Sequence, residues 1–131
     1  MDIATHPLIG TWSLLSYEVR GSDGSVRRPL GANPAGLGIY TAEGLVSAQL
    51  MRPGPRTDDR RDYVAYAGRW TCDGTSVSHH VDLALHDDWV GTTLVRTFTL
   101  QSGRLVLEPP ATERDGVTFQ PALTWGRAET S

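Results

Sequence analysis

Residues 68–100 read GRWTCDGTSVSHHVDLALHDDWVGTTLVRTFTL. Apolar and polar residues alternate over 76–85 and again over 92–100, a pattern typical of strands that bury one face. The dipeptide Asp73-Gly74 favours a tight turn before the first alternating segment, and residues 86–91 form a short connection before the second. The stretch therefore predicts three consecutive antiparallel strands, at 68–72, 76–85 and 92–100.

The same pattern continues on both sides of this stretch. Short apolar runs, separated by glycine, proline and aspartate turns, predict further strands at 12–20, 36–40, 45–51, 104–107 and 117–127. About eight or nine strands at such short spacing predict an all-β fold, a single antiparallel up-and-down barrel. A barrel of about eight strands holds one small ligand, and its closure leaves no sheet edge exposed.

One segment favours a helix instead of a strand. Over Asp58–Ala67, charged residues crowd the first turn, Tyr63 and Tyr66 are three positions apart, and Gly68 follows as a stop signal. We therefore expect a short helix over the barrel mouth, where Tyr66 is the better placed of the two tyrosines to contact a ligand.

Composition limits the class of protein. The 131 residues carry 12 basic and 15 acidic side chains, and the net charge of −3 gives no reason to expect nucleic acid or an anionic membrane as a partner. The length predicts one domain, spanning 1–131 with an ordered core at about 7–127. The sequence has neither a membrane-length apolar run nor a signal-peptide pattern, so we expect a cytoplasmic protein that is monomeric or weakly dimeric.

Several absences bear on the chemistry. Every basic residue is arginine, which excludes a lysine Schiff base and a P-loop lysine. A fixed positive charge in a site must then be a guanidinium, which binds a carboxylate or an enolate through two bonds. Cys72 is the single cysteine, which excludes an intrachain disulfide and a cysteine metal cluster. His79 and His80 point to opposite faces of one strand, so we expect no metal and no other cofactor.

Two polar side chains belong to faces that are otherwise apolar. His79 and Arg96 each lie in the apolar set of an alternating stretch, and both are therefore expected to face the cavity. If Val81 pairs with Arg96 and His79 pairs with Phe98, then His79 and Arg96 are diagonal neighbours. An interior arginine either pairs with an internal carboxylate, for which Glu18 is the best candidate, or binds an anionic group of a ligand.

Further side chains are candidates for the cavity wall. The hairpin at 36–51 has two possible inward faces. The more apolar face consists of Leu37, Ile39, Val46, Ala48 and Leu50, and the other of Tyr40, Leu45, Ser47, Gln49 and Met51. Ser47 and Gln49 remain ligand-binding candidates because a cavity tolerates a few polar groups. Trp70, Trp89 and Phe98 are expected in either the cavity wall or the core.

Short motifs along most of the chain resemble one family. LIGTW at 8–12 carries a Gly-x-Trp signature, and LTWGR at 123–127 is similar to the closing strand of lipocalin barrels, in which an arginine lies across the opening tryptophan. The intervening motifs are IYTAEG (39–44), SAQLM (47–51), YAG (66–68), HHV (79–81) and WVGT (89–92). Together, over about residues 7–127, they resemble the microbial lipocalin-like domain family. The resemblance implies a calycin-type barrel with a ligand cavity, whose floor Trp12, Trp125 and Arg127 close.

The resemblance also implies two functions that share one pocket. Some members of the family act as cofactor-free cyclases or isomerases of polyketide- or terpenoid-like substrates in natural-product biosynthesis. In such an enzyme, or in a related lyase, His79 moves a proton, Arg96 stabilises an enolate or a carboxylate, and Tyr66 or Gln49 adds a hydrogen bond. The alternative is an intracellular carrier, in which Arg96 pairs with the carboxylate of a hydrophobic acid. A haem-binding barrel with His79 as axial ligand is a third, weaker alternative.

Overall fold

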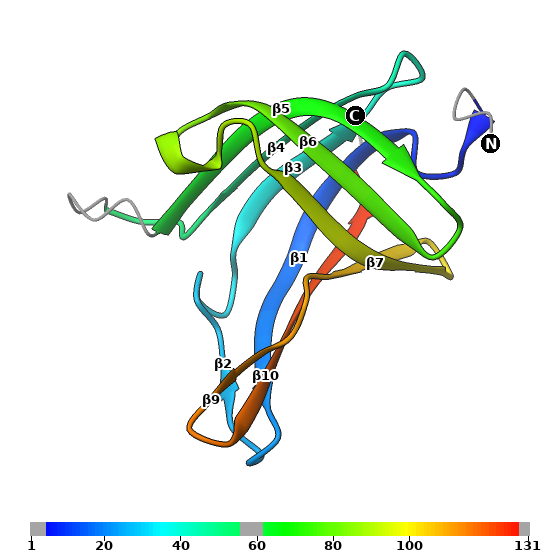
Figure 1. Ribbon diagram of the computed structural model, residues 1–131. Helices are drawn as coiled ribbons and strands as arrows, with labels where there is room; N and C mark the ends of the chain where they lie inside the picture. The colour runs from blue at the N-terminus through cyan, green and yellow to red at the C-terminus, as the bar shows by residue number, and fades with distance from the viewer. Residues whose placement is uncertain (1–4, 56–61, 129–131) are drawn as a thin grey trace.

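The computed structural model describes residues 5–55 and 62–128, which form ten strands (Figure 1). The strands are β1 (Gly10–Gly21), β2 (Val26–Arg27), β3 (Ala35–Tyr40), β4 (Leu45–Met51), β5 (Tyr63–Cys72), β6 (Ser76–Ala84), β7 (Thr93–Gln101), β8 (Arg104–Glu108), β9 (Thr112–Arg114) and β10 (Val117–Arg127). A 3-10 helix, η3 (Asp87–Trp89), connects β6 to β7. No helix in the described residues is long and apolar enough to cross a bilayer.

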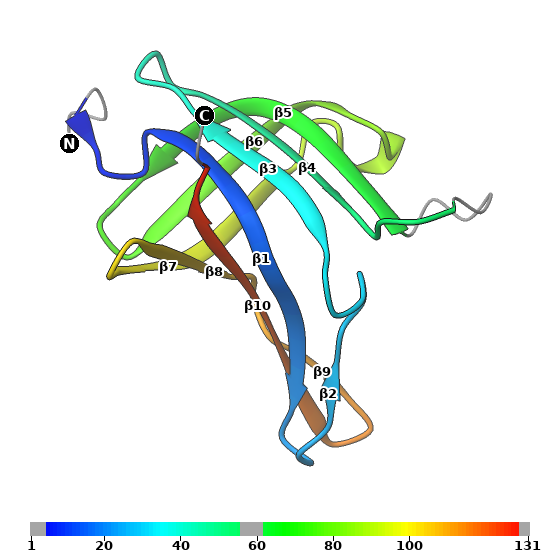
Figure 2. The same ribbon diagram turned by 180° about the vertical axis from the view of Figure 1, so that it is seen from behind.

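Eight of the described strands close into an antiparallel barrel. They follow the order β1-β3-β4-β5-β6-β7-β8-β10, and the pairing of β10 with β1 closes the ring. The far ends of β1 and β10 continue beyond the barrel, flanked there by the short strands β2 and β9 (Figures 1 and 2). The predicted all-β, up-and-down barrel is thereby confirmed.

The predicted helix is wrong over Tyr63–Ala67. Tyr63–Ala67 begin β5 and pair with β4, and residues 58–61 lie outside the described residues. The three-residue spacing of Tyr63 and Tyr66 suggested a helix, but the side chains of β5 alternate between two faces. Tyr66 and Trp70 are buried on one face of the strand, whereas Arg69 is exposed on the other.

The barrel floor is built around Trp12. Its side chain is 1% exposed, and its Nε1 donates a hydrogen bond to the Leu8 carbonyl at 2.9 Å. The Arg127 guanidinium lies 3.9 Å above the centroid of the Trp12 ring and donates to the carbonyls of Ile9 and Pro7. Gly10, at φ 127°, leaves room for that guanidinium, since a Cβ there would lie 2.5 Å from Nη1 of Arg127. The structure thus agrees with the floor that the resemblance implies.

Two irregularities reverse which side chains point inward. In β1, Leu14 pairs with Trp125 and Ser16 pairs with Thr124, so Leu15 is a bulge and the alternation changes phase after it. In β6, the pairing with β5 passes from Val81 to Leu83 and omits Asp82. Leu83, which the alternation places inside, is therefore 69% exposed on the outer wall.

Candidate functional site

The barrel contains a cavity of about 100 Å³. Aliphatic side chains from β4, β8 and β10 form much of its wall. They are Val46, Ala48, Leu50, Leu105, Leu107 and Leu123. Trp12 and Trp125 contribute from the floor side, and Trp89 of η3 contributes from the connection between β6 and β7. An apolar cavity of roughly 150 Å³ accommodates benzene, so this space is somewhat smaller than that of a single ring.

A buried histidine lies between two buried tyrosines on the cavity wall. His79 of β6 is 2% exposed, and Tyr40 of β3 and Tyr66 of β5 are 3% and 8% exposed. The Tyr40 hydroxyl lies 2.7 Å from Nε2 of His79, and the Tyr66 hydroxyl lies 2.7 Å from Nδ1. Both ring nitrogens are therefore hydrogen-bonded, and we call these three residues the Tyr–His–Tyr triad.

The triad is uncharged at neutral pH. Burial, assisted by the positive charge of Arg96, lowers the pKa of His79 to about 3. Burial raises the pKa of Tyr66 to about 12 and raises the pKa of Tyr40 well above its usual value. From the ordinary pKa of histidine we expected His79 to exchange a proton near neutral pH. Its lowered pKa makes that expectation wrong. His79 still lines the cavity.

The neutral state fixes the hydrogen-bond directions within the triad. A neutral imidazole has one N–H and one nitrogen lone pair. One tyrosine hydroxyl therefore donates to His79, and the oxygen of the other accepts the His79 N–H. The second tyrosine keeps its own hydroxyl hydrogen, which has no acceptor among the described residues. One O–H donor is thus available to a molecule in the cavity.

Arg96 also lines the cavity, from β7. Its pairing differs from the expectation, since Val77 and not Val81 lies opposite Arg96, and Leu94 lies opposite His79. The diagonal relation between His79 and Arg96 is preserved in the new register. Within residues 5–55 and 62–128, the Arg96 guanidinium forms no ion pair, and its Nη1 donates to the Val95 carbonyl at 3.3 Å.

Glu18 is not the partner of Arg96. The bulge at Leu15 turns Glu18 outward, where its carboxylate forms ion pairs of 2.9 Å with both Arg20 and Arg28. The bulge brings Tyr17 to the cavity wall instead. The prediction that Glu18 faces the cavity assumed a regular strand, and the single extra residue makes it wrong.

Ser47 and Gln49 lie on the outer face of β4, so their prediction as cavity residues is wrong. The Gln49 amide donates to the Ser47 hydroxyl at 2.9 Å. The inward face of the hairpin instead joins Tyr40 to its cross-strand partner Val46. Each predicted face combined inward-pointing residues of one strand with outward-pointing residues of the other. The turn occupies 42–44, and the Thr41 N–H donates to the Leu45 carbonyl, so that Tyr40 lies opposite Val46. A reading of the turn one residue shorter than 41–44 would have identified Tyr40.

One of the three predicted aromatic residues lines the cavity, and the other two do not. Trp89 lines the cavity, and its ring centroid lies 5.8 Å from that of Tyr66. Trp70 is 1% exposed, donates from Nε1 to the Thr41 carbonyl at 3.0 Å, and packs edge-on against Tyr40. Phe98 packs against His6, with ring centroids 5.9 Å apart. Trp70 therefore packs against a member of the triad, and neither Trp70 nor Phe98 lines the cavity.

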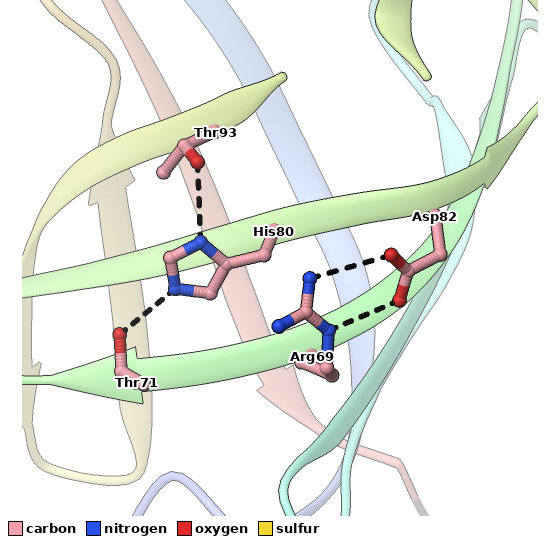
Figure 3. Close-up of polar contacts among 5 residues, drawn as sticks. All are labelled: Arg69, Thr71, His80, Asp82 and Thr93. Atoms are coloured by element: carbon pink, nitrogen blue, oxygen red, sulfur yellow. Dashed lines mark hydrogen bonds and ion pairs between the residues drawn. The ribbon is translucent and has the colours of Figure 1, made fainter. Parts of the chain in front are cut away.

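The outer wall of β5 and β6 has different chemistry (Figure 3). His80 points away from the barrel, and its ring nitrogens lie 3.1 Å from the hydroxyl oxygens of Thr71 and Thr93. Beside it, Arg69 and Asp82 form an exposed ion pair at 3.2 Å. His79 and His80 thus occupy opposite faces, as predicted. In the described part of the chain, no three His, Cys, Asp or Glu side chains gather as metal ligands would.

Comparison with known proteins identifies the family. A profile of the Lipocalin-like domain family matches residues 9–61 and 55–128, which together include every barrel strand. No curated protein and no solved structure matches the chain. The barrel with an apolar internal cavity agrees with the ligand-binding architecture of such domains. The chain belongs to the lipocalin-like domain family.

Proposed function

We propose that the barrel binds one small, mostly apolar molecule that carries a carbonyl or a carboxylate. The position of Arg96 carries the proposal, because this cation lies on an apolar cavity and has no carboxylate partner in the described residues. Arg96 is half-buried, and a guanidinium beside an apolar cavity can bind a carboxylate through two parallel hydrogen bonds. The free tyrosyl hydroxyl of the triad supplies a further donor to an oxygen of the ligand.

The binding test compares an acid with an alcohol of similar size. Isothermal titration calorimetry at pH 7 would measure the dissociation constants of cyclohexanecarboxylate and cyclohexylmethanol. We expect the acid to bind more tightly, and Arg96→Gln to weaken its binding by at least about tenfold, the lower range for a hydrogen bond to a charged group. The same change should leave the alcohol unaffected.

Arg69→Gln is the matched control, because Arg69 is an arginine of the outer wall. It should leave the affinity for the acid unchanged. Equal affinities of the wild-type protein and Arg96→Gln for cyclohexanecarboxylate would overturn the proposal.

Cofactor-free isomerisation or cyclisation is the second candidate, and the triad favours it. The tyrosine that accepts the His79 N–H gives its own hydroxyl proton to a ligand carbonyl oxygen, and the His79 N–H proton moves to that tyrosine. The other tyrosine, which donates to His79, passes its hydroxyl proton to the unprotonated nitrogen of His79 and takes a proton from the carbon beside the carbonyl. The ligand becomes an enol, the triad stays neutral overall, and no other reactant is needed. Such an enol is the nucleophile in double-bond migration and in ring closure.

Proton exchange separates this enzyme from a carrier. The probe is cyclohexanone in D₂O, and NMR follows the loss of its α-protons with and without the protein. An enzyme should accelerate exchange by about 10²–10⁴-fold, the usual contribution of general acid–base catalysis. Tyr40→Phe and Tyr66→Phe should each remove the acceleration, because each breaks the proton path. Binding of the acid probe without accelerated exchange would assign the carrier function instead.

A further inference from the structure

The two ends of the barrel differ in how they are closed. At the floor, Leu8 and Trp12 are 0% and 1% exposed, and the Arg127 guanidinium donates to the Ile9 and Pro7 carbonyls. From β1 to β7 each strand is antiparallel to the next, so β6 ends and β7 begins at the opposite end, which we call the mouth. The connection that carries η3 therefore lies at the mouth, away from the N-terminus (Figures 1 and 2). A ligand enters the barrel from the mouth and not through the sealed floor.

Trp89 of η3 closes the cavity at the mouth. It lines the cavity, and its ring centroid lies 5.8 Å from that of Tyr66 and 5.7 Å from that of His86. Apart from Pro109, every other described residue of the cavity wall belongs to a strand. Trp89 is half-buried, whereas Trp12 of the floor is 1% exposed and held by its indole hydrogen bond. Trp89 is therefore a part of the wall that no strand holds in place.

The turn that carries Trp89 has little to hold it against the barrel. Its Trp89 N–H donates to the His86 carbonyl at 3.0 Å, a bond within the connection itself. After the turn, the Gly91 N–H donates to the Val81 carbonyl at 2.9 Å and ties the chain to β6. None of the three residues of η3 is buried. A segment with few buried contacts opens at a small cost in free energy, and such loops commonly control access to a site.

The site is too enclosed to admit a ring-sized acid unless part of the wall moves. His79, Tyr40 and Tyr66 are 2%, 3% and 8% exposed. The cavity of about 100 Å³ is smaller than the roughly 150 Å³ in which benzene fits. Displacement of the Trp89 indole opens the mouth and enlarges the cavity in one movement.

We propose that Trp89 is the gate of the cavity and limits the size of the acid that the barrel accepts. An acid of about one ring enters when the indole moves aside. A bulky substituent on that ring competes with the indole for the same space, so larger acids bind more weakly. The inference rests on the proposed binding of a carboxylate at Arg96, and it does not depend on catalysis.

Two acids that differ in size test the limit. Isothermal titration calorimetry at pH 7 would compare cyclohexanecarboxylate with trans-4-tert-butylcyclohexanecarboxylate. The wild-type protein should bind the smaller acid at least about tenfold more tightly, because the larger one overpacks the closed cavity. Trp89→Ala, which empties the mouth, should abolish this preference. Trp89→Leu, which keeps a smaller apolar side chain there, should lose part of it.

Val90→Ala is the matched control. Val90 follows Trp89 in the same connection, but it is 49% exposed and does not line the cavity. This variant should keep the preference for the smaller acid.

The association rate tests the gate separately from the affinity. Stopped-flow tryptophan fluorescence would follow the binding of cyclohexanecarboxylate, which Trp12 and Trp125 of the cavity wall report even in Trp89→Ala. Trp89→Ala should raise the association rate constant at least about tenfold, because binding that requires a conformational change is slow. An unchanged size preference or an unchanged association rate in Trp89→Ala would overturn the role of Trp89 and leave the proposed function intact. If neither acid binds the wild-type protein or Trp89→Ala, both proposals fail.

Discussion

His79 and His80 are neighbours in β6, and each contacts two hydroxyl groups through its ring nitrogens, yet they differ in burial and in the face of the sheet that they occupy. His79 is 2% exposed and hydrogen-bonded on both nitrogens to buried tyrosine hydroxyls. His80 is on the outer wall and contacts the hydroxyls of Thr71 and Thr93 (Figure 3). The difference arises from strand alternation alone, which sends successive side chains to opposite faces. We therefore predict that substitutions on the inner wall lower the free energy of unfolding more than substitutions on the outer wall.

The largest contrast is expected for a large apolar side chain. Trp12→Ala on the inner wall should lower the free energy of unfolding by about 3–5 kcal/mol, because it leaves a void at the barrel floor. Leu83→Ala on the outer wall should change it by less than about 0.5 kcal/mol, because Leu83 is 69% exposed. Urea denaturation measures both values. Equal effects would show that the floor around Trp12 is misplaced.

The two histidines provide the next contrast. His79→Ala should lower the free energy of unfolding by about 2–4 kcal/mol, because it removes a buried ring and leaves two buried tyrosine hydroxyls without a partner. His80→Ala should lower it by less than about 0.5 kcal/mol. The measurement is again urea denaturation at pH 7. A larger loss in His80→Ala than in His79→Ala would reverse the assignment of the two faces.

The pH dependence of stability sharpens the same contrast. The pKa of His79 is about 3 in the folded protein and near 6.5 in an unfolded chain. Between these values only the unfolded chain binds the proton, so the free energy of unfolding falls as the pH falls from about 6.5 towards 3. The slope from this one group is up to about 1.4 kcal/mol per pH unit.

His79→Gln should lose this part of the slope, and His80→Ala should keep it because His79 is intact. Denaturation series from pH 7 to pH 4 would measure the slopes. An unchanged slope in His79→Gln would contradict the buried, neutral state of His79.

The smallest effect is expected for the ion pair on the outer wall. The side chains of Arg69 and Asp82 are 63% and 51% exposed, so Asp82→Asn should lower stability by about 0.2–1 kcal/mol. The effect should shrink in 1 M salt, because exposed charges are screened there. A salt-independent loss of more than about 2 kcal/mol would mean that this wall is covered in solution.

Much of the fold could be predicted because the sequence alternates so regularly. The period-two pattern of 76–85 and 92–100 is sufficient to place His79 and Arg96 inside a barrel, and the structure brings both to one cavity. Alternation cannot reveal where it changes phase. One bulged residue, Leu15, turns Glu18 outward, and the irregularity near Asp82 does the same to Leu83.

The residues missed at the site depend on pairing between strands. Tyr40 reaches the cavity because the β3–β4 register pairs it with Val46, and no pattern within either strand alone contains that information. Trp125 could be placed at the floor, but only the positions of the neighbouring carbonyls show that its N–H has no partner among the described residues. The expected helix failed for a related reason, since pairing with β4 outweighs the local helical signal at Tyr63–Ala67.

A crystal structure of the complex with cyclohexanecarboxylate tests the central claim most directly. We predict the ring inside the barrel, with its carboxylate oxygens within about 3 Å of the Arg96 guanidinium nitrogens and one of them near a triad hydroxyl. Density for the acid on the outer wall, or inside the barrel with its carboxylate turned away from Arg96, would contradict it.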